Sequence, residues 1–326
     1  MKVIGLGNAL VDILVQLDSD DIVNTLGFPK GSMQLIDSDA IPRIAELIDP
    51  YSAVLISGGS AANTIHGLSS LGTKTGFFGK VGKDEMGEFY MNDLKTAGVE
   101  STLLRSDTVT GRAYTLITPD TERTFATYLG AAVEMTEAEI SRELFANYQM
   151  LHIEGYLVQN TMLIEQALKM AKSEGLKISL DLASFNVVES NLEFLKRVIP
   201  DYVDIVFANE EEAHAFTGKD PENALQELGD ICDIAVVKTG KEGSLILSEG
   251  NMIKIGVIEV KALDTTGAGD QYAAGFIHGL SLGMSMDKCG ELGSLLAGTV
   301  IENYGARIPE KLWSSVLKKV EKIKNS

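Results

Sequence analysis

Cysteine and histidine are both scarce in this chain of 326 residues. The two cysteines, Cys232 and Cys289, are far apart in the sequence and form no CxxC pair. This spacing excludes both a disulfide framework and a cysteine-based zinc site, so we expect two reduced thiols. The histidines show no metal-ligand spacing either, and we expect each to be structural or exposed: His66, His152, His214 and His278.

Long apolar runs are also absent. Nowhere do about 18 apolar residues follow one another, which is the length that a membrane-spanning helix needs. The N-terminal segment MKVIGLGNALVDILV is interrupted by Asp12 and lacks the small-residue cleavage pattern of a signal peptide. We therefore expect a cytoplasmic protein with no membrane partner.

Positively charged residues are also few. The chain has 28 Lys and Arg against 46 Asp and Glu, for a formal net charge of −18. This field repels nucleic acid, so no nucleic-acid partner is expected, and it repels polyphosphates such as ATP as well. The GxxxxGK[ST] phosphate loop is missing too. Any polyphosphate site must therefore be built locally from backbone N–H groups, helix N-termini and a bound cation.

The second half of the chain alternates between strand and helix patterns. Strands are expected over 150–154, 177–182, 203–207 and 233–238, with helices over 160–174 and 190–198 and between 207 and 231, and three more helices after residue 266. Such alternation predicts βαβ units and a mostly parallel sheet. Because no linker or repeat interrupts the chain, we expect one α/β domain over residues 1–326.

A different pattern occupies residues 102–128, where two short β-type runs flank a turn at Pro119-Asp120. We expect this hairpin to join short strands near 13–17 and 33–36 in a small β-sheet. That sheet would form a lid over the main domain, drawn from about 8–20, 30–38 and 102–130. The run AVLIS at 53–57 is expected to be a buried strand that ends at a glycine pair.

The strongest local signal is the turn DTTGAGD, residues 264–270, which opens a helix. Gly267 and Gly269 let the backbone approach a ligand closely, and the first N–H groups of the helix point toward it. Such an anion hole suits the oxygens of a transferring phosphoryl group. Asp270, in the same helical turn, is placed to act as a general base. The alternative is an ordinary glycine turn in which Asp270 merely starts a helix.

Two other motifs lack the sequence or structural context that their function would require. GLGNAL at 5–10 lacks the third glycine of a dinucleotide-binding loop because Leu10 replaces it. The GxSxG pattern at 279–283 ends a helix, whereas the nucleophile of a hydrolase needs a strand-to-helix turn.

DTTGAGDQYAAGF resembles the second signature of the ribokinase (PfkB) family, in which the final aspartate is the catalytic base. The resemblance implies an ATP-dependent kinase with a ribokinase-like three-layer α/β fold, a mostly parallel central sheet and a small β-sheet lid. Asp270 would then be the base, in an anion hole made with Gly267, Ala268 and Gly269. The segment from 58 to 87, which begins GGSAANTIHG, resembles the first signature and implies acceptor binding by Gly58, Gly59 and Asn63, joined by Asp12 from GNALVDI.

The nucleotide side follows from the same resemblance. NEEEA at 209–213 is similar to the family's N-x-x-E motif, so Asn209 and Glu212 would arrange hydrated Mg²⁺, with Glu212 acting through water. VVKTGKEGS at 236–244 falls where the family binds ATP. The residues implied on this side are Lys238, Gly240, Gly243, Asp264 and Thr265. A monovalent cation and a homodimer through the lid are further expectations.

The acceptor is less sharply defined. The segments around Asn8, Asp12 and Gln34 resemble the adenosine kinases of this family more than its ribokinases. The segment HIEGYL at 152–157 points the same way, because it places Tyr156 or Leu157 where an aromatic or apolar wall would face the base of a nucleoside. Glu154 could instead bind a sugar, as in ribokinases. Arg123 either meets phosphate or is a solvated lid residue. A nucleoside acceptor is favoured, a ribokinase- or fructokinase-type sugar kinase is the alternative, and a non-catalytic nucleoside or sugar sensor is the rival outside enzymes.

Overall fold

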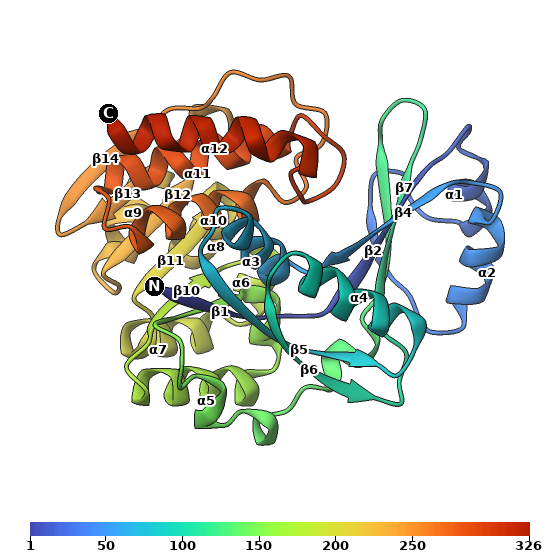
Figure 1. Ribbon diagram of the computed structural model, residues 1–326, viewed down its shortest axis with the longest axis horizontal. Helices are drawn as coiled ribbons and strands as arrows, with labels where there is room; N and C mark the ends of the chain where they lie inside the picture. The colour runs from blue at the N-terminus through green and yellow to red at the C-terminus, as the bar shows by residue number, and fades with distance from the viewer.

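A computed structural model describes residues 1–326, and its centre is a large nine-stranded sheet (Figure 1). The strand order is β14-β13-β12-β11-β10-β9-β1-β5-β6. Neighbours from β12 to β6 run parallel, and β13 and β14 are antiparallel. The strands are β1 (Lys2–Leu6), β5 (Lys74–Gly82), β6 (Glu100–Ser106), β9 (Met150–Glu154), β10 (Lys177–Asp181), β11 (Ile205–Asn209), β12 (Ile234–Lys238), β13 (Ser244–Ser248) and β14 (Asn251–Ile255).

Helices cover both faces of this sheet. Alternate residues of β11 show how the faces divide, because Phe207 packs into one buried cluster and Val206 into the other. The Phe207 face is covered by α3 (Ser60–Ser70), α4 (Glu85–Thr96), α10 (Ala268–Ser281), α11 (Met286–Val300) and α12 (Glu310–Asn325). The Val206 face is covered by α5 (Thr161–Ser173), α6 (Phe185–Ser190), α7 (Leu192–Tyr202), α8 (Glu210–Thr217) and α9 (Pro221–Gly229). The predicted three-layer α/β fold is confirmed.

A second sheet, which we call the lid, stands beside the first (Figure 1). Its order is β3-β8-β7-β2-β4, with strands β2 (Leu10–Gln16), β3 (Met33–Leu35), β4 (Ala53–Gly58), β7 (Gly111–Ile117) and β8 (Arg123–Tyr128). Two helices not anticipated from the sequence, α1 (Asp21–Leu26) and α2 (Ala40–Ile48), pack with Val11, Ile13 and Val15 of β2. The other face of β2, with Leu10 and Asp12, is thereby left to face the main domain.

Two of the strand predictions, one in the lid and one outside it, are wrong. Residues 102–106 belong to β6, which pairs in parallel with β5 at the edge of the large sheet. The run 53–57 is a strand, but it forms the outer edge of the lid as β4, where Val54 is 58% exposed. An uninterrupted apolar run fits an edge strand as well as a central one, so the pattern could not distinguish them.

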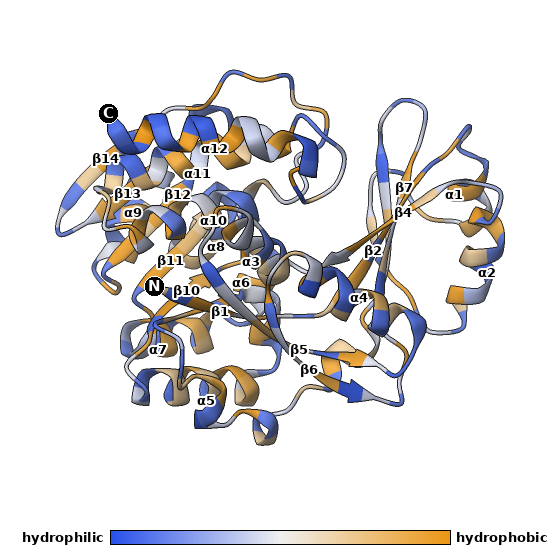
Figure 2. Ribbon diagram, in the orientation of Figure 1, coloured by the Kyte–Doolittle hydropathy of each residue, from blue (hydrophilic) through white to orange (hydrophobic).

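The C-terminal helix α12 is amphipathic, and short 3₁₀ turns complete the fold. Figure 2 shows hydrophilic and hydrophobic residues alternating along α12, of which Trp313, Val316 and Val320 are buried. None of the helices has the length and apolar content that crossing a membrane requires. The 3₁₀ turns are Gly130–Glu134, Glu137–Glu139, Arg142–Leu144, Gly155–Gln159 and Gly240–Glu242.

Candidate active site

A cavity of about 1730 Å³ lies between the lid and the carboxyl ends of the parallel strands. The final residues of four neighbouring strands line it: Glu154, Asp181, Asn209 and Lys238. Single ligand sites usually measure about 300–1,000 Å³. The cavity is therefore large enough for two small molecules side by side, in the crevice where parallel α/β sheets usually bind ligands.

The glycine-rich turn opens α10 at one wall of this cavity. Gly267 has φ 73°, and a side chain there would overlap the backbone of Ala306. The first regular bond of the helix joins the Gln271 amide to the Gly267 carbonyl at 2.9 Å. The N–H groups of Gly269 and Asp270 come before that bond, so helix geometry leaves them free to bind an anion. Ala268 lines the cavity beside them.

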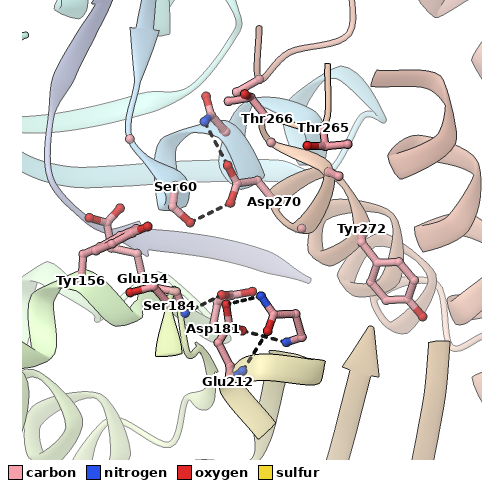
Figure 3. A pocket seen from close by; sticks show the side chains of 18 of the residues that line it. Ser60, Glu154, Tyr156, Asp181, Ser184, Glu212, Thr265, Thr266, Asp270 and Tyr272 are labelled. Atoms are coloured by element: carbon pink, nitrogen blue, oxygen red, sulfur yellow. Dashed lines mark hydrogen bonds between the residues drawn. The ribbon is translucent and has the colours of Figure 1, made fainter. Parts of the chain in front are cut away.

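Asp270 faces the start of a second helix across this wall. Its carboxylate accepts hydrogen bonds from Ser60 Oγ at 2.7 Å and from Asn63 Nδ2 at 3.0 Å, both on α3 (Figure 3). Burial raises the pKa of Asp270 to about 6, and the two hydrogen bonds oppose that rise. The carboxylate is thus ionised at neutral pH, yet it is basic enough to take up a proton.

Asp12 projects into the same cavity from the lid strand β2. It sits against Gly58, where any Cβ would overlap the Asp12 carboxylate, so Gly58 supports this side chain without lining the cavity itself. Gly59 has φ 99°, and a side chain there would overlap the Asn8 carbonyl. Burial raises the pKa of Asp12 to about 7, and Arg307 counteracts part of the rise.

Two amide oxygens provide acceptors near these carboxylates. Asn8 Oδ1 and Asn63 Oδ1 are buried without a hydrogen-bond partner, and both residues line the cavity. An unpaired buried acceptor costs about 1–3 kcal/mol, and a hydroxyl donated by a ligand would remove that cost. The geometry therefore suits a small molecule with several hydroxyl groups.

Beyond the polar groups, a further part of the cavity lining is apolar. Tyr156 contributes a side chain that is 41% exposed and lies beside Glu154 in Figure 3. Burial raises the pKa of the Tyr156 hydroxyl to about 12, so it stays neutral. The other apolar residues of this part of the lining are Met33, Leu35, Leu129, Val133, Met135, Leu157 and Met162. This wall suits a flat apolar group of the ligand.

Gln34 is the predicted acceptor contact that the structure turns away from the cavity. Its neighbours Met33 and Leu35 line the cavity, but the Gln34 side chain donates to Ser32 Oγ at 2.9 Å. Because side chains alternate along a strand, residues 33 and 35 of β3 share one face and Gln34 takes the other. In this structure Gln34 therefore does not line the cavity, and its role in substrate binding stays a prediction.

Lys238 supplies a positive charge at the cavity, next to the start of α10. Its ammonium group donates to Asp181 Oδ2 at 2.8 Å, and it lies 3.0 Å from the position that a Cβ of Gly269 would take. Burial opposes the charge on Lys238, but Asp181 and Glu212 outweigh it and raise the pKa. Gly240 and Gly243 line the same side, and Gly243 has φ 99° and no room for a side chain. Lys238 is thus a fixed cation beside the anion hole.

Asn209 and Glu212 form a closed capping box at the start of α8. Glu212 accepts from the Asn209 backbone and from Asn209 Nδ2, both at 2.7 Å, while the Glu212 N–H donates to Asn209 Oδ1 at 2.8 Å. Burial raises the pKa of Glu212 to about 7. Figure 3 shows Glu212 beside Asp181, across the cavity from Asp270. No three His, Cys, Asp or Glu side chains are grouped to hold a metal.

Asp264 and Arg123 bond to each other rather than to the cavity. Arg123, the first residue of β8, donates to the Asp264 carboxylate and to Thr266 Oγ1. Asp264 also accepts from the Thr266 N–H at 2.7 Å and the Gly305 N–H at 2.8 Å. Asp264 does not line the cavity, whereas Thr265 does. Asp264 therefore shapes the turn. Arg123 joins the lid to that turn, a role that neither of the two hypotheses drawn from the sequence included.

An Arg123→Met variant is expected to loosen the lid. A hydrogen bond to a charged group contributes about 1.5–3 kcal/mol, so its loss should speed amide hydrogen exchange in β7 and β8 by about 10-fold or more. Hydrogen-exchange mass spectrometry of the two proteins measures the difference. Arg197→Met is the matched control, because Arg197 pairs with Glu165 between two helices of the main domain, α7 and α5. Equal lid protection in all three proteins would show that the Arg123 contact does not hold the lid.

Sequence reasoning missed several residues of this site. Ser60, which contacts Asp270, follows the glycine pair at the helix start, and Asp181 ends a parallel strand, so both positions carried a signal. The second apolar wall carried none, because it combines an irregular loop with one face of α11. Its residues are Val257, Ile258, Val260, Ala262, Ala297, Gly298 and Ile301.

Known proteins share this architecture along almost its whole length. The model of the pfkB family carbohydrate kinases matches residues 32–312. The crystal structure of adenosine kinase from Sinorhizobium meliloti is 35% identical, superposes with a TM-score of 0.85, and the match covers 98% of each chain.

Two curated proteins show the range of acceptors among the relatives. A nucleoside kinase from Methanothermobacter thermautotrophicus is 31% identical over 82% of this chain and 88% of its own length. A 5-dehydro-2-deoxygluconokinase from Bacillus subtilis is 30% identical over 83% of this chain and 88% of its own length. The chain therefore belongs to the pfkB family of carbohydrate kinases, in an adenosine kinase-like branch, and it is a phosphotransferase with an alcohol group as acceptor.

Proposed function

We propose that this enzyme transfers the γ-phosphoryl group of ATP to the primary hydroxyl of a nucleoside, with an adenosine-like nucleoside favoured. The observation that carries this proposal is the apolar wall of Tyr156, Leu35 and Met162 on the acceptor side of the cavity. A free sugar has only its small C–H faces to bury there, whereas a base offers a larger flat surface.

ATP fits the opposite half of the cavity. The apolar wall between the 257–262 loop and α11 suits its base, and Lys238 with the N–H groups of Gly269 and Asp270 suits its terminal phosphates. Mg²⁺, when bound with ATP, supplies charge neutralisation on those phosphates. Glu212 and Asn209 are occupied by their capping box, so we infer that their contact with the hydrated ion runs through water.

Each group of residues in the site then has a separate role in the phosphoryl transfer. Asp12, Asn8 and Asn63 hold the acceptor's hydroxyl groups, and Asp270 takes the proton of the attacking hydroxyl. The free N–H groups at the start of α10 bind the oxygens of the transferring group. The lid excludes water, which competes as a phosphoryl acceptor.

An acceptor screen tests the proposal. ADP release by the purified enzyme is measured with adenosine, inosine, ribose and fructose, and binding is measured by thermal shift. Burial of one large apolar group contributes about 1.5–3 kcal/mol, so kcat/KM for adenosine should exceed that for ribose by roughly 10- to 100-fold. Leu35→Ala should reduce that ratio without affecting ribose.

Two outcomes of the screen would replace the proposal. Equal or better turnover of ribose or fructose would assign a sugar kinase, as the relation to the 5-dehydro-2-deoxygluconokinase from Bacillus subtilis allows. Saturable binding without ADP release would favour a sensor. A homodimer through the lid stays a prediction, which the exposed Val54 and Leu55 of edge strand β4 support.

A further inference from the structure

Glu154 is a buried carboxylate that the proposed chemistry does not use. It ends β9 and is only 1% exposed, although it borders the cavity. Its Oε1 accepts from the Asn8 N–H at 2.9 Å and from Asn8 Nδ2 at 2.7 Å, and its Oε2 accepts from the Ala61 N–H at 2.9 Å. Three donors of the protein thus fill most of the roughly four acceptor positions of a carboxylate.

The backbone around Glu154 is shaped to admit it. Gly7 has no Cβ, and one built there would overlap Glu154 Oε2 and the Ala61 side chain. Ala61 is the second residue of α3, so the carboxylate lies at the N-terminus of a helix, where a negative charge is stabilised. Burial raises the pKa of Glu154 to about 7, while the three hydrogen bonds oppose the rise. A specific anion site has therefore been built for this side chain.

The charge of Glu154 dictates how the Asn8 amide is oriented. Glu154 Oε1 already accepts from the Asn8 backbone N–H, which fixes this oxygen as an acceptor, so Asn8 Nδ2 is the side-chain atom that faces it. Asn8 Oδ1 must then point the other way, where it is buried without a protein partner in a residue that lines the cavity. Asn8 consequently offers the ligand an acceptor and no donor.

We propose that Glu154 is a positioning residue that fixes the Asn8 amide, so that the acceptor molecule must supply a hydroxyl donor to Asn8 Oδ1. Glu154 itself then does not contact the acceptor, in contrast to the sugar-binding role considered from the sequence. This inference rests on the proposed function, because it concerns how the acceptor is recognised. It predicts selectivity for one particular hydroxyl group of the ring.

The substitution Glu154→Gln changes the amide orientation with little change of volume. The introduced nitrogen must face a backbone N–H, either that of Asn8 or that of Ala61. Only on the Asn8 side can a partner side chain turn to accept from it, so the Asn8 amide is expected to rotate. Asn8 Oδ1 then faces residue 154 and its nitrogen faces the cavity.

The test compares binding and kcat/KM for adenosine, 2′-deoxyadenosine and 3′-deoxyadenosine. In the native enzyme, removal of the hydroxyl that meets Asn8 should weaken the acceptor by about 10-fold, the value of a neutral hydrogen bond. In Glu154→Gln the hydroxyl must accept from Asn8 Nδ2 instead of donating to Oδ1, so this ratio should decrease, while the ratio for the other hydroxyl persists. Asn8→Ala, which removes both partners, should bring the ratio to about 1, and the double variant should lose nothing beyond that.

Other outcomes would overturn the inference. If Glu154→Gln weakens all three nucleosides by one common factor, or if its effect adds to that of Asn8→Ala, Glu154 has only a structural role. If the native enzyme responds to no nucleoside, the proposed function fails, and ribose with 2-deoxyribose takes the place of the nucleosides. Urea unfolding of the four ligand-free proteins tests the pairing itself: additive effects of the two substitutions would refute it.

Discussion

An Asp270→Asn variant is expected to lose at least about 10²-fold in kcat while its ligand binding largely survives. A positioned general base contributes about 10²–10⁴-fold, and an amide cannot accept the proton. The shape of the site should persist. The remaining oxygen can still accept from Asn63 Nδ2, and the Ser60 hydroxyl, which can accept as well as donate, can face the introduced nitrogen, so Asn63 keeps Oδ1 for the ligand. Steady-state kinetics together with thermal shifts for each ligand separate turnover from binding.

The pH dependence gives this prediction a second readout. The pKa of Asp270 is about 6, and the ionised form is the active one, so kcat of the native enzyme should fall as the pH drops below that value. The limb should disappear from the residual activity of Asp270→Asn. Ser60→Ala is the matched control, because it removes one hydrogen bond but leaves the carboxylate, and we expect a loss of no more than about 10-fold. Near-normal turnover of Asp270→Asn would refute the role of the base.

The parts of the fold that could be predicted were those with strong local signals. β9, β10, β11 and β12 are short apolar runs separated by helical periodicity, and a parallel sheet follows from that alternation alone. Helix α1 lacked such a signal because it has only six residues. Helix α2 did carry one, since Ile41, Ile44 and Ile48 recur at helical spacing, but it was not anticipated. Whether a strand lies at an edge depends on which strand pairs with it, so the exposure of β4 could not be read from AVLIS.

The site residues, too, could be predicted only where their signal was local in the sequence. Asp270 and the glycines of its turn stand in one continuous motif, where a positive φ and a helix start are local properties. Which side chains of β3 face the cavity depends on the register of that strand, and the sequence around Gln34 does not reveal that register. The contact of Arg123 with Asp264 joins positions 141 residues apart, and no local pattern reports such a pairing.

Replacing Lys238 by methionine is expected to damage both stability and turnover. Removal of one partner of a buried ion pair leaves Asp181 uncompensated, which typically costs about 3–5 kcal/mol. Because the Lys238 side chain keeps 16% exposure and that of Asp181 keeps 9%, we expect a decrease near about 3 kcal/mol in the free energy of unfolding. Urea unfolding measures it. Loss of the cation beside Gly269 should also lower kcat by about 10²–10³-fold.

A second substitution separates these two effects. Asp181→Asn in the Lys238→Met background removes the stranded charge but keeps an oxygen for the Ala183 N–H, which Asp181 Oδ1 binds at 2.9 Å. Ala183 has φ 66°, so this bond helps to hold a strained turn and should be retained. The double variant is therefore expected to recover most of the lost stability and none of the lost turnover. If the double variant regains activity, Lys238 serves only to balance Asp181; if it stays as unstable as Lys238→Met, the uncompensated charge was not the cause. Recovery of stability alone would assign the lysine to the transferring phosphoryl group, because its charge would then matter for turnover and not for balancing Asp181.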